Sequence, residues 1–435
     1  MISAETVAAS VPLRVCHLIT TLDVGGAELM LARLVERMDP VRFRCDVISL
    51  VEPGPVGVRL RDAGVAVTSL GLRRGRPALG AVPRLVRMLR EHRPDLLQTW
   101  LYHADLLGLV AGRLAGVPHI LWNVRNSDMA MGRYALLSRL TLHACRLAAR
   151  YPDGIVVNSR AGYDHHRRLG YRARVWFFIP NGIDLECFRP DAAARARVRD
   201  ELGIPLEAPL IGFVARVDPM KDHETFLRAA ALLARQRPDV RFLLAGAGTG
   251  PGGGIDGPVR EAALGARLVR LGAREGMPGI TAALDVAASV SRFGEGFPNV
   301  VAEALACGVP CVVTDVGDAA RIVGRAGAVV PLGEPQPLAD AWEELITAGP
   351  EARYAMGRQG RERVGHLYSL TRAVERYEDL YASVAEGGTP ESQVSDFGTV
   401  DQHPAAESSA SPPGGPSRGV SDAPRVVGGP PRGVA

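Results

Sequence analysis

Short apolar runs alternate with amphipathic helical segments along most of this chain, and that alternation limits the possible folds more than any other feature. Strands are expected at 14–20, 43–50, 65–70, 96–99, 119–123, 155–159 and 176–179, and then at 210–215, 241–245, 267–271, 286–290, 311–314 and 328–330. Strands separated by helices form parallel sheets with helices on both faces. Because the pattern restarts after a polar helical segment at 191–202, the 435-residue chain is expected to form two doubly wound α/β domains.

The expected domain boundaries follow from the same pattern. The first domain is assigned to residues 1–190 and the second to residues 191–370, with a last helix at 371–386. From about residue 387 to residue 435, glycine, proline and serine dominate and the apolar periodicity ends. Such a composition cannot bury enough apolar surface to fold, so this tail is predicted to be disordered.

Composition excludes several other classes of protein. No apolar stretch approaches the roughly 20 residues that a membrane-spanning helix needs. The first twelve residues lack a basic segment followed by an apolar one, so no signal peptide is expected. The six cysteines are scattered and do not follow zinc-site spacing, which favours buried, reduced thiols in a cytoplasmic protein and no metal site.

Charge is distributed unevenly along the chain. Residues 1–190 hold 26 arginines against 16 acidic residues, a balance of +10, whereas the remainder carries −6. A basic first half favours contact with an anionic surface, such as the inner membrane, or with a phosphorylated acceptor. The alternative is a solvated, arginine-rich surface. No interleaving of basic and aromatic residues indicates nucleic-acid binding.

The run Glu-Gly-Phe-Pro-Asn-Val-Val-Ala-Glu at 295–303 carries the clearest chemical signal. Pro298 and Asn299 are helix-start signals, with Asn299 as a candidate N-cap, so a short helix is expected at 300–306. The first N–H groups of a helix have no helical partner and can bind an anion. Glu295 and Glu303 bracket this anion site, a combination suited to a phosphorylated ligand with many hydroxyls, such as a nucleotide sugar. The alternative is an ordinary strand-to-helix turn with two surface glutamates.

Two cations follow the strand expected at 210–215. Arg216 and Lys221 lie five residues apart, just past the carboxyl end of that strand, where open α/β sheets bind their ligands. Lys221 is the single lysine among 51 basic residues. A compact ammonium can reach between phosphate oxygens where arginine's planar fork does not fit. Chance survival of one lysine in a surface turn is the alternative.

Other loops after strands add weaker candidates. Gly25 and Gly26 follow the first strand and would let a ligand approach the backbone closely, or would simply form a tight turn. His103 opens a helix after the strand at 96–99 and could hydrogen-bond a sugar hydroxyl, or could cap that helix. The glycines at 248–253 match dinucleotide-site spacing, but Pro251 and the lack of a following acidic residue argue against such a site.

The run from Glu295 to Asp315 resembles the donor-site signature of the family-4 retaining glycosyltransferases, which are two-domain GT-B enzymes, and the similarity extends over roughly residues 14–385. The resemblance implies that Arg216 and Lys221 neutralise the departing diphosphate, although Ala215 stands where the family often has glycine. It implies catalytic roles for His103, Glu295, Arg216 and Lys221. The implied donor-binding set is Gly25, Gly26, Arg216, Lys221, Phe297, Pro298, Asn299, Val300 and Glu303.

The resemblance also implies separate tasks for the two glutamates. Glu303 would hydrogen-bond the ribose hydroxyls, since a carboxylate can accept from both hydroxyls of a cis-diol. Glu295 would approach the transferred sugar. The last helix, near 371–385, would cross back to the first domain. No metal and no cofactor are expected, the nucleotide sugar being a co-substrate.

These inferences predict a retaining glycosyltransferase that moves a sugar from a nucleotide-diphosphate sugar to a glycan or lipid-linked acceptor in bacterial polysaccharide or glycolipid synthesis. The second domain would bind the donor and the first the acceptor, in the cytoplasm or at the inner face of the membrane. Two alternatives stay open: a nucleotide-sugar epimerase on the same fold, and a non-catalytic sugar-nucleotide-binding protein.

Overall fold

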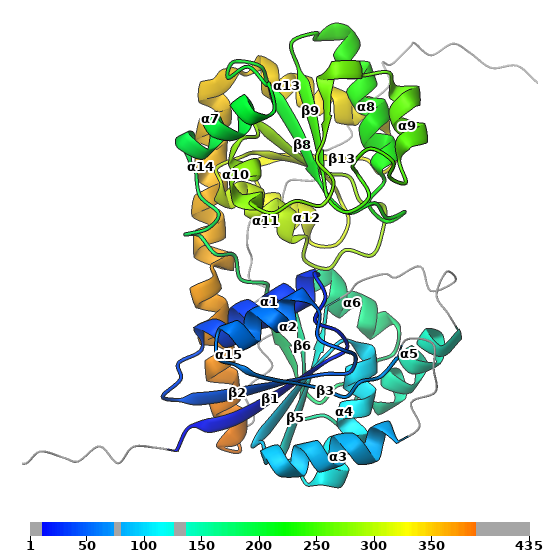
Figure 1. The fold of residues 1–435 in the computed structure, drawn as a ribbon, viewed down its shortest axis with the longest axis vertical. Helices are drawn as coiled ribbons and strands as arrows, with labels where there is room; N and C mark the ends of the chain where they lie inside the picture. The colour runs from blue at the N-terminus through cyan, green and yellow to red at the C-terminus, as the bar shows by residue number, and fades with distance from the viewer. Residues whose placement is uncertain (1–10, 74–79, 126–135, 389–435) are drawn as a thin grey trace, which may run out of the picture. The chain divides into compact units, whose positions relative to one another are not determined.

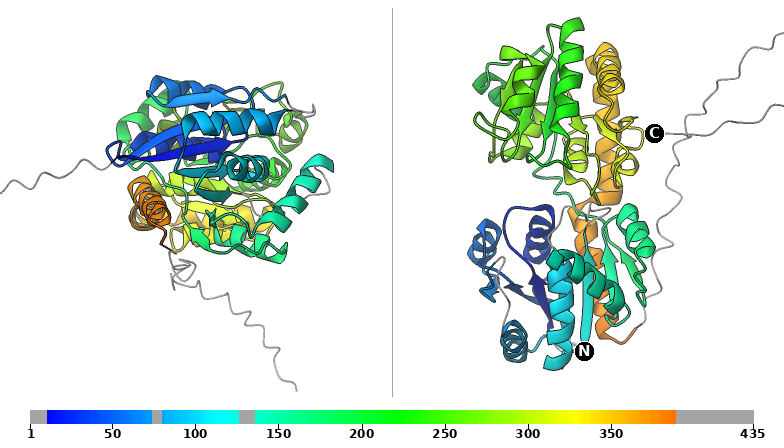
Figure 2. Two further views of the ribbon diagram at one scale, coloured as in Figure 1. Left: turned by 90° about the horizontal axis from the view of Figure 1, so that it is seen from below. Right: turned by 90° about the vertical axis from the view of Figure 1, so that its right-hand side faces the viewer.

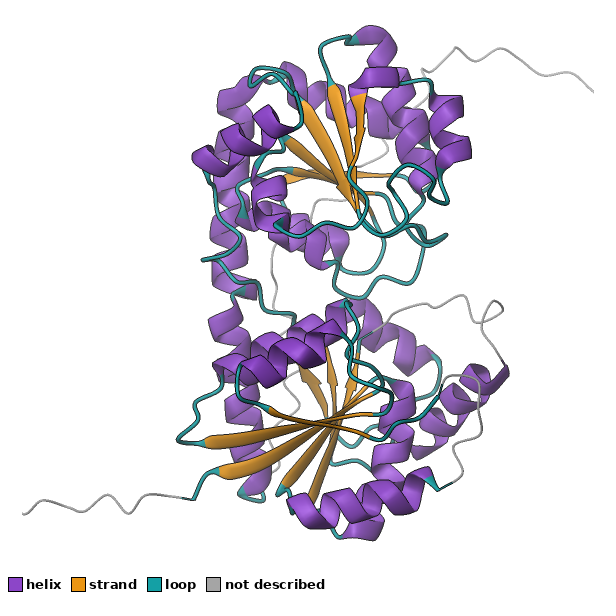
Figure 3. Ribbon diagram, viewed as in Figure 1, coloured by secondary structure: helices purple, strands orange, loops and turns teal. Residues whose placement is uncertain are grey.

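The computed structural model describes residues 11–73, 80–125 and 136–388, and the predicted tail from residue 389 onward therefore lies outside the described residues. Two sheets dominate it, each with helices on both faces (Figures 1 and 3). Every strand pair in both sheets is parallel. The predicted fold class, two Rossmann-like doubly wound domains of GT-B type, is confirmed.

The first sheet has seven strands in the order β3-β2-β1-β4-β5-β6-β7. Its strands are β1 (Leu13–Ile19), β2 (Phe43–Ser49), β3 (Ala66–Ser69), β4 (Leu96–Trp100), β5 (His119–Val124), β6 (Gly154–Val157) and β7 (Trp176–Phe178). Its helices are α1 (Gly26–Arg37), α2 (Pro55–Asp62), α3 (Ala81–His92), α4 (Tyr102–Ala115), α5 (Leu136–Ala148) and α6 (Arg160–Arg168). We call these elements the first domain.

The second sheet has six strands in the order β10-β9-β8-β11-β12-β13. Its strands are β8 (Leu210–Val214), β9 (Arg241–Ala245), β10 (Leu268–Arg270), β11 (Val286–Ser289), β12 (Cys311–Thr314) and β13 (Gly327–Val330). The helices of this second domain are α7 (Ala192–Glu201), α8 (His223–Gln236), α9 (Asp256–Ala262), α10 (Met277–Ala282), α11 (Asn299–Ala306), α12 (Ala319–Val323), α13 (Pro335–Thr347) and α14 (Gly349–Tyr368), followed by α15 (Leu370–Ala385).

The last two helices pack on different sheets. Val364 and Tyr368 of α14 are buried in the core of the second domain. Tyr377 and Tyr381 of α15 are fully buried in a core that also holds Trp100 at the end of β4. The α15 helix therefore lies against the first sheet although it follows the second in sequence, as the orange helix in Figure 2 shows.

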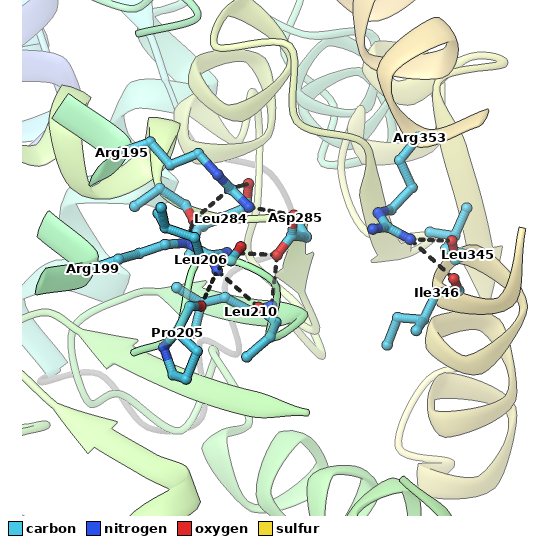
Figure 4. Close-up of polar contacts among 12 residues, drawn as sticks. Arg195, Arg199, Pro205, Leu206, Leu210, Leu284, Asp285, Leu345, Ile346 and Arg353 are labelled. Carbon is cyan, nitrogen blue, oxygen red and sulfur yellow. Dashed lines mark hydrogen bonds and ion pairs between the residues drawn. The ribbon is translucent and has the colours of Figure 1, made fainter. Parts of the chain in front are cut away.

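A buried arginine fixes α7 to the base of the second sheet (Figure 4). The Arg199 guanidinium donates to the carbonyl oxygens of Ala283, Pro205, Leu206 and Ala208 at 2.8–3.0 Å. It also donates to Asp285 at 2.6 Å, and Arg195 donates to the other oxygen of the same carboxylate at 2.8 Å. Because a buried charge is tolerated only when paired and hydrogen-bonded, this cluster holds α7 in one position.

The structure corrects the predicted start of the helix after β11. Pro298 occupies the N-cap position of α11, with φ −72° and ψ 97°, and Asn299 is the first helical residue rather than the cap. Proline suits this place because its missing N–H would have no helical partner anyway. Five helices, α2, α5, α6, α10 and α12, were not predicted, since short amphipathic segments give weak periodicity.

None of the helices in the described part of the chain is long and apolar enough to cross a membrane.

Candidate active site

The predicted site residues gather at the two places where strand order reverses. In the first sheet, β1 and β4 are neighbours, and Gly25, Gly26 and His103 follow them. In the second sheet, β8 and β11 are neighbours. The loop that carries Arg216 and Lys221 follows β8, and the start of α11 follows β11. Open α/β sheets bind ligands at this switch point, because the two loops there diverge to opposite faces and leave a crevice.

Lys221 and Glu295 form an ion pair across the second switch point. The Lys221 ammonium donates to Glu295 Oε1, which also accepts from the Ser291 hydroxyl at 2.7 Å. The two side chains are only 14% and 9% exposed. The carboxylate thus fixes the ammonium at the carboxyl end of β8, where an anionic group could meet it.

The loop that carries Lys221 is held from both sides. Asp222 has φ +53° and caps α8, accepting from the Thr225 hydroxyl at 2.6 Å. Arg292 donates through Nε to Asp222 at 2.6 Å and through its backbone N–H to the Met220 carbonyl at 2.8 Å. These bonds tie the loop after β8 to the loop after β11, which explains why Lys221 and Glu295 meet.

Arg216 lies beside this pair but is much more open. Its side chain is 60% exposed and pairs with Asp218 at 3.0 Å. The glycine loop after β9 backs onto it: a Cβ at Gly246, where φ is +138°, would lie 2.2 Å from the Ala215 carbonyl oxygen. The glycines after β9 therefore permit close backbone packing beside Arg216.

The residues at the start of α11 have different surroundings: Phe297 is buried in the core, and Asn299 contacts Asn181. Phe297 is buried and stacks edge-on against Tyr368 with ring centroids 5.2 Å apart, so only its backbone can serve a ligand. Asn299 accepts a 2.6 Å hydrogen bond from the Asn181 amide. A Cβ at Gly26 would lie 3.4 Å from the Asn299 amide nitrogen, so the glycine loop of the first domain faces this helix start.

Glu303 is held from the opposite domain. Arg33 of α1 approaches its Oε1 at 3.4 Å, and the two side chains are 14% and 16% exposed. Burial raises the pKa of Glu303 above its ordinary value, and the nearby Arg33 charge opposes that rise. One carboxylate of the predicted donor site is therefore in contact with the first domain.

Gly25 makes room for a buried carboxylate that the sequence analysis did not single out. Gly25 is the N-cap of α1, and a Cβ there would lie 2.3 Å from Glu28 Oε2. Burial raises the pKa of Glu28, while the charges of Arg125 and Arg216 act in the other direction. The first helical turn of α1 thus holds a largely buried carboxylate beside Gly25.

His103 stands in the second position of α4, after a strained residue. Leu101 has φ +72°, which is costly for a residue with a branched side chain, and this turn directs α4 away from β4. The buried Asp105 supports the turn by accepting from the Thr99 hydroxyl at 2.5 Å. His103 is exposed to solvent as a whole residue. Neighbouring groups still desolvate part of its ring, which lowers the pKa of His103 below its ordinary value.

A buried polar network lies beneath these loops. The Arg125 guanidinium donates to the Tyr377 hydroxyl of α15 at 2.8 Å and to the Asn181 side chain, and it lies 4.4 Å from the Trp100 ring centroid. Asn123 also donates to Tyr377 at 2.8 Å. The network reaches Asn299 through Asn181 and so joins the first sheet, α15 and α11.

A second link joins the loop after β12 to α6. Both carboxylate oxygens of Asp318 accept backbone N–H groups, from Arg160 at 2.8 Å and Ala161 at 2.9 Å. Gly296 lies close by, because its carbonyl oxygen accepts from the Asp318 N–H at 2.9 Å, and a Cβ at Gly296 would be 2.9 Å from the Arg125 carbonyl oxygen. Asp318 therefore caps a helix of the other domain, and Gly296 leaves no space between the two loops.

Several functional contacts were thus missed from the sequence. Arg33 and Asp318 touch residues more than 150 positions away, so only the fold brings them together, whereas Glu28 and Ser291 touch residues three and four positions away. The Glu28 position, three residues after Gly25, offered a local signal, since acidic residues favour the first turn of a helix. Within residues 11–73, 80–125 and 136–388, no group of three His, Cys, Asp or Glu side chains could hold a metal ion.

Two parallel-sheet domains, with basic and acidic side chains gathered at both switch points, define a GT-B-type architecture. Comparison with protein families gives the same class. Residues 24–187 match the family described as Glycosyltransferase Family 4, and residues 208–348 match the one described as Glycosyl transferases group 1.

Curated relatives extend over most of the chain. A Bacillus subtilis (strain 168) protein named "Putative glycosyltransferase EpsF" is 30% identical over 366 residues, which span 80% of this chain and 90% of the relative. A D-inositol 3-phosphate glycosyltransferase of Corynebacterium urealyticum is 31% identical over 314 residues, 67% of this chain and 69% of the relative. The chain belongs to the family-4 glycosyltransferases.

Solved structures share the fold. Anabaena Alr3699/HepE, crystallised with UDP, is 23% identical and superposes with a TM-score of 0.73, covering 85% of this chain and all of that one. Sucrose-phosphate synthase from Thermosynechococcus elongatus is 22% identical, with a TM-score of 0.72 over 86% of this chain and all of its own.

Proposed function

We propose that this glycosyltransferase moves a sugar from a nucleoside-diphosphate sugar to a glycan or lipid-linked acceptor, with retention of the anomeric configuration. The observation that carries the proposal is the second switch point, where the paired Lys221 ammonium, the first turn of α11 and the largely buried Glu303 follow the neighbouring strands β8 and β11. Cations and free N–H groups suit a diphosphate, and the carboxylate suits a ribose.

In the proposed reaction the bond between the sugar's anomeric carbon and the diphosphate oxygen breaks, and a bond from the same carbon to the acceptor oxygen forms on the same face. The acceptor proton passes to the leaving diphosphate. Lys221, Arg216 and the backbone N–H groups of Phe297, Asn299 and Val300 would stabilise the charge that develops on that diphosphate. These groups would supply the positive potential without a metal ion.

The two glutamates would divide the donor between them. Glu303 would accept from the ribose hydroxyls, so a nucleotide would compete with Arg33 for this carboxylate. Glu295 would hold Lys221 toward the diphosphate and approach the transferred sugar. His103 of the first domain would meet that sugar from the other side. Gly25 and Gly26 would give the acceptor or the phosphates access to the backbone of α1.

The location of the reaction is part of the same proposal. All six cysteines are free thiols, which supports a reducing, cytoplasmic compartment. The basic balance of residues 1–190 supports contact with the inner face of an anionic membrane, where a lipid-linked acceptor would be found.

The test is incubation of the purified protein with labelled nucleotide sugars and a panel of acceptors. UDP-glucose is the first donor, because the related Anabaena protein was crystallised with it, and D-inositol 3-phosphate is one acceptor, after the name of the actinobacterial relatives. Free nucleotide with a glycosylated product of unchanged anomeric configuration, measured by NMR, supports the proposal. An isomerised sugar would instead indicate an epimerase, and an inverted product would contradict the retaining mechanism.

A further inference from the structure

The outer face of α5 forms a surface that the proposed chemistry does not use. We define the α5 surface as Leu140, Leu147, Tyr151, Arg139, Arg146, Arg150 and Arg172. Its three large apolar side chains are 58%, 60% and 49% exposed in that order. Leu140 and Leu147 are seven residues apart and share one stripe of the helix, and Tyr151 follows where the helix ends.

The inner face of the same helix is apolar as well. Leu142, Cys145 and Ala149 are buried in the core of the first domain. A surface helix of a water-soluble domain needs only one apolar face, so leucines on the outer face indicate a second apolar environment.

Arginines surround these apolar side chains. A hollow of about 660 Å³ is lined by Leu147, Ala148 and Tyr151 together with Arg146, Arg150 and Arg172. A second hollow of about 330 Å³ on the other side of α5 is lined in part by Arg139, His143 and Arg146. No acidic side chain lines either hollow among the described residues. Both hollows are therefore apolar floors with cationic rims.

Arg146 stands between the two hollows. Its Nε is buried and has no hydrogen-bond partner among the described residues, and its Cδ lies 3.6 Å from where a Cβ at Gly170 would be. Because this Nε is buried, only the outer part of the partly exposed guanidinium can meet an oxyanion.

The neighbouring helix α4 also carries exposed apolar side chains, although Leu114 lines a separate hollow against α3. Val110 and Leu114 of α4, which packs beside α5, are 44% and 58% exposed. Arg113 donates to the Tyr151 carbonyl at 2.8 Å and so ties the end of α4 to the turn after α5. The surface is therefore a fixed feature of two packed helices.

We propose that the α5 surface docks on an anionic lipid bilayer. Leu140, Leu147 and Tyr151 enter the boundary between headgroups and acyl chains, as interfacial leucines and tyrosines do. The arginines bind lipid phosphates, which guanidinium groups match in geometry and charge. Charge complementarity selects a bilayer over a second copy of the chain, whose α5 surface would bring like charges together. The inference deepens the proposed function, and rests on it only in that a lipid-linked acceptor would be met there.

The test is flotation of the full chain with vesicles, without donor or acceptor. The protein should float with phosphatidylcholine vesicles that contain phosphatidylglycerol, less at high salt, and not with phosphatidylcholine alone. The triple variant Arg139→Ser/Arg150→Ser/Arg172→Ser should bind roughly a hundredfold more weakly, from the worth of each arginine near an anionic surface. The variant Leu140→Ser/Leu147→Ser should lose binding at least about tenfold.

Matched controls use exposed residues elsewhere. Arg44→Ser/Arg325→Ser/Arg358→Ser removes the same charge, and Leu206→Ser/Leu332→Ser removes leucines that are 54% and 46% exposed. Both should float like the unchanged protein. Equal losses in test and control variants, or no flotation with anionic vesicles, would overturn the proposal. A dimer that only the α5 leucine variant dissociates would also overturn it, by making the surface an interface between copies.

Failure of this inference and failure of the proposed function give different results. Flotation without any nucleotide binding would contradict the proposed function and leave the α5 surface standing. Nucleotide binding without flotation would contradict the α5 inference alone. Thermal denaturation of each variant checks that the fold is intact.

Discussion

At the scale of single residues, the lone lysine has a structural explanation. Lys221 lies between an acidic partner and the carboxyl end of a strand, with its side chain 14% exposed. All the other 50 Lys or Arg positions of the chain are arginine. A planar guanidinium needs a fork of acceptors. Here the acceptor is Glu295 Oε1, which also accepts from the Ser291 hydroxyl. A compact ammonium fits that single acceptor and leaves donors for a phosphate.

We predict that Lys221→Ala lowers kcat/KM for the donor on the order of 100- to 1,000-fold, the usual effect of losing one group that stabilises a developing anion. Lys221→Arg should recover only part of this, because its fork cannot occupy the same place. Steady-state kinetics would measure both effects, with the donor that the labelled nucleotide-sugar assay identifies. Activity of Lys221→Arg equal to that of the unchanged protein would show that charge alone matters at this position.

Some contacts of single residues could be predicted from the sequence, and others could not. Glu295 and Glu303 could be placed near one helix start because they stand in one run with it. Arg33 and Asp318 could not, since each acts on a residue more than 150 positions away. Phe297 was predicted within the donor set, and only its burial against Tyr368 shows that its side chain serves the core.

At the scale of elements, strand and helix order followed from apolar periodicity, whereas helix ends did not. The α11 helix begins at Asn299, one residue before the predicted start, because Asn299 is bonded to Asn181 and does not cap its own helix. The polar segment at 191–202 was recognised as a helix, but nothing local showed that Arg199 is buried against Asp285.

We predict that Asp285→Ala destabilises the protein by about 3–5 kcal/mol, because it leaves the buried Arg199 charge unpaired. Denaturant unfolding monitored by circular dichroism would measure the change. Glu224→Ala removes an exposed ion pair with Arg228 and is the matched control, with a change of about 0.5 kcal/mol or less. A small effect for Asp285→Ala would mean that the carbonyl oxygens around Arg199 suffice to hold its charge.

At the scale of the whole molecule, buried histidines predict how stability depends on pH. Burial lowers the pKa of His17 to about 3 and those of His166 and His223 to about 4. His166 donates from Nδ1 to the Gly162 carbonyl, and its Nε2 lies 2.7 Å from the Tyr102 hydroxyl, from which a neutral ring can accept. Between about pH 4 and pH 6.5 these three rings therefore bind more protons in the unfolded chain than in the folded one.

These three histidines should thus make the free energy of unfolding fall as the pH drops from 6.5 toward 4, whereas burial raises the pKa of the Glu28, Asp105, Glu303 and Asp318 carboxyls, which act in the opposite direction. Each of these histidines contributes about 1.4 kcal/mol per pH unit once the unfolded ring is protonated. Urea unfolding between pH 7.5 and pH 5 would measure this slope, above the range where most carboxylates titrate. His17→Gln should reduce this slope by about 1.4 kcal/mol per pH unit, the contribution of one proton. An unchanged slope would contradict a neutral, buried His17.

The central claim for the whole molecule is that one donor site lies at the second switch point, with the nucleoside at Glu303 and the diphosphate at Lys221. Calorimetric titration of UDP, GDP and inorganic pyrophosphate into the unchanged protein, Glu303→Ala and Lys221→Ala tests this claim directly. Glu303→Ala should weaken binding of the preferred nucleoside diphosphate by about tenfold or more and leave pyrophosphate binding unchanged, whereas Lys221→Ala should weaken both. Equal nucleotide affinities in all three proteins, or loss of pyrophosphate binding in Glu303→Ala alone, would contradict this assignment.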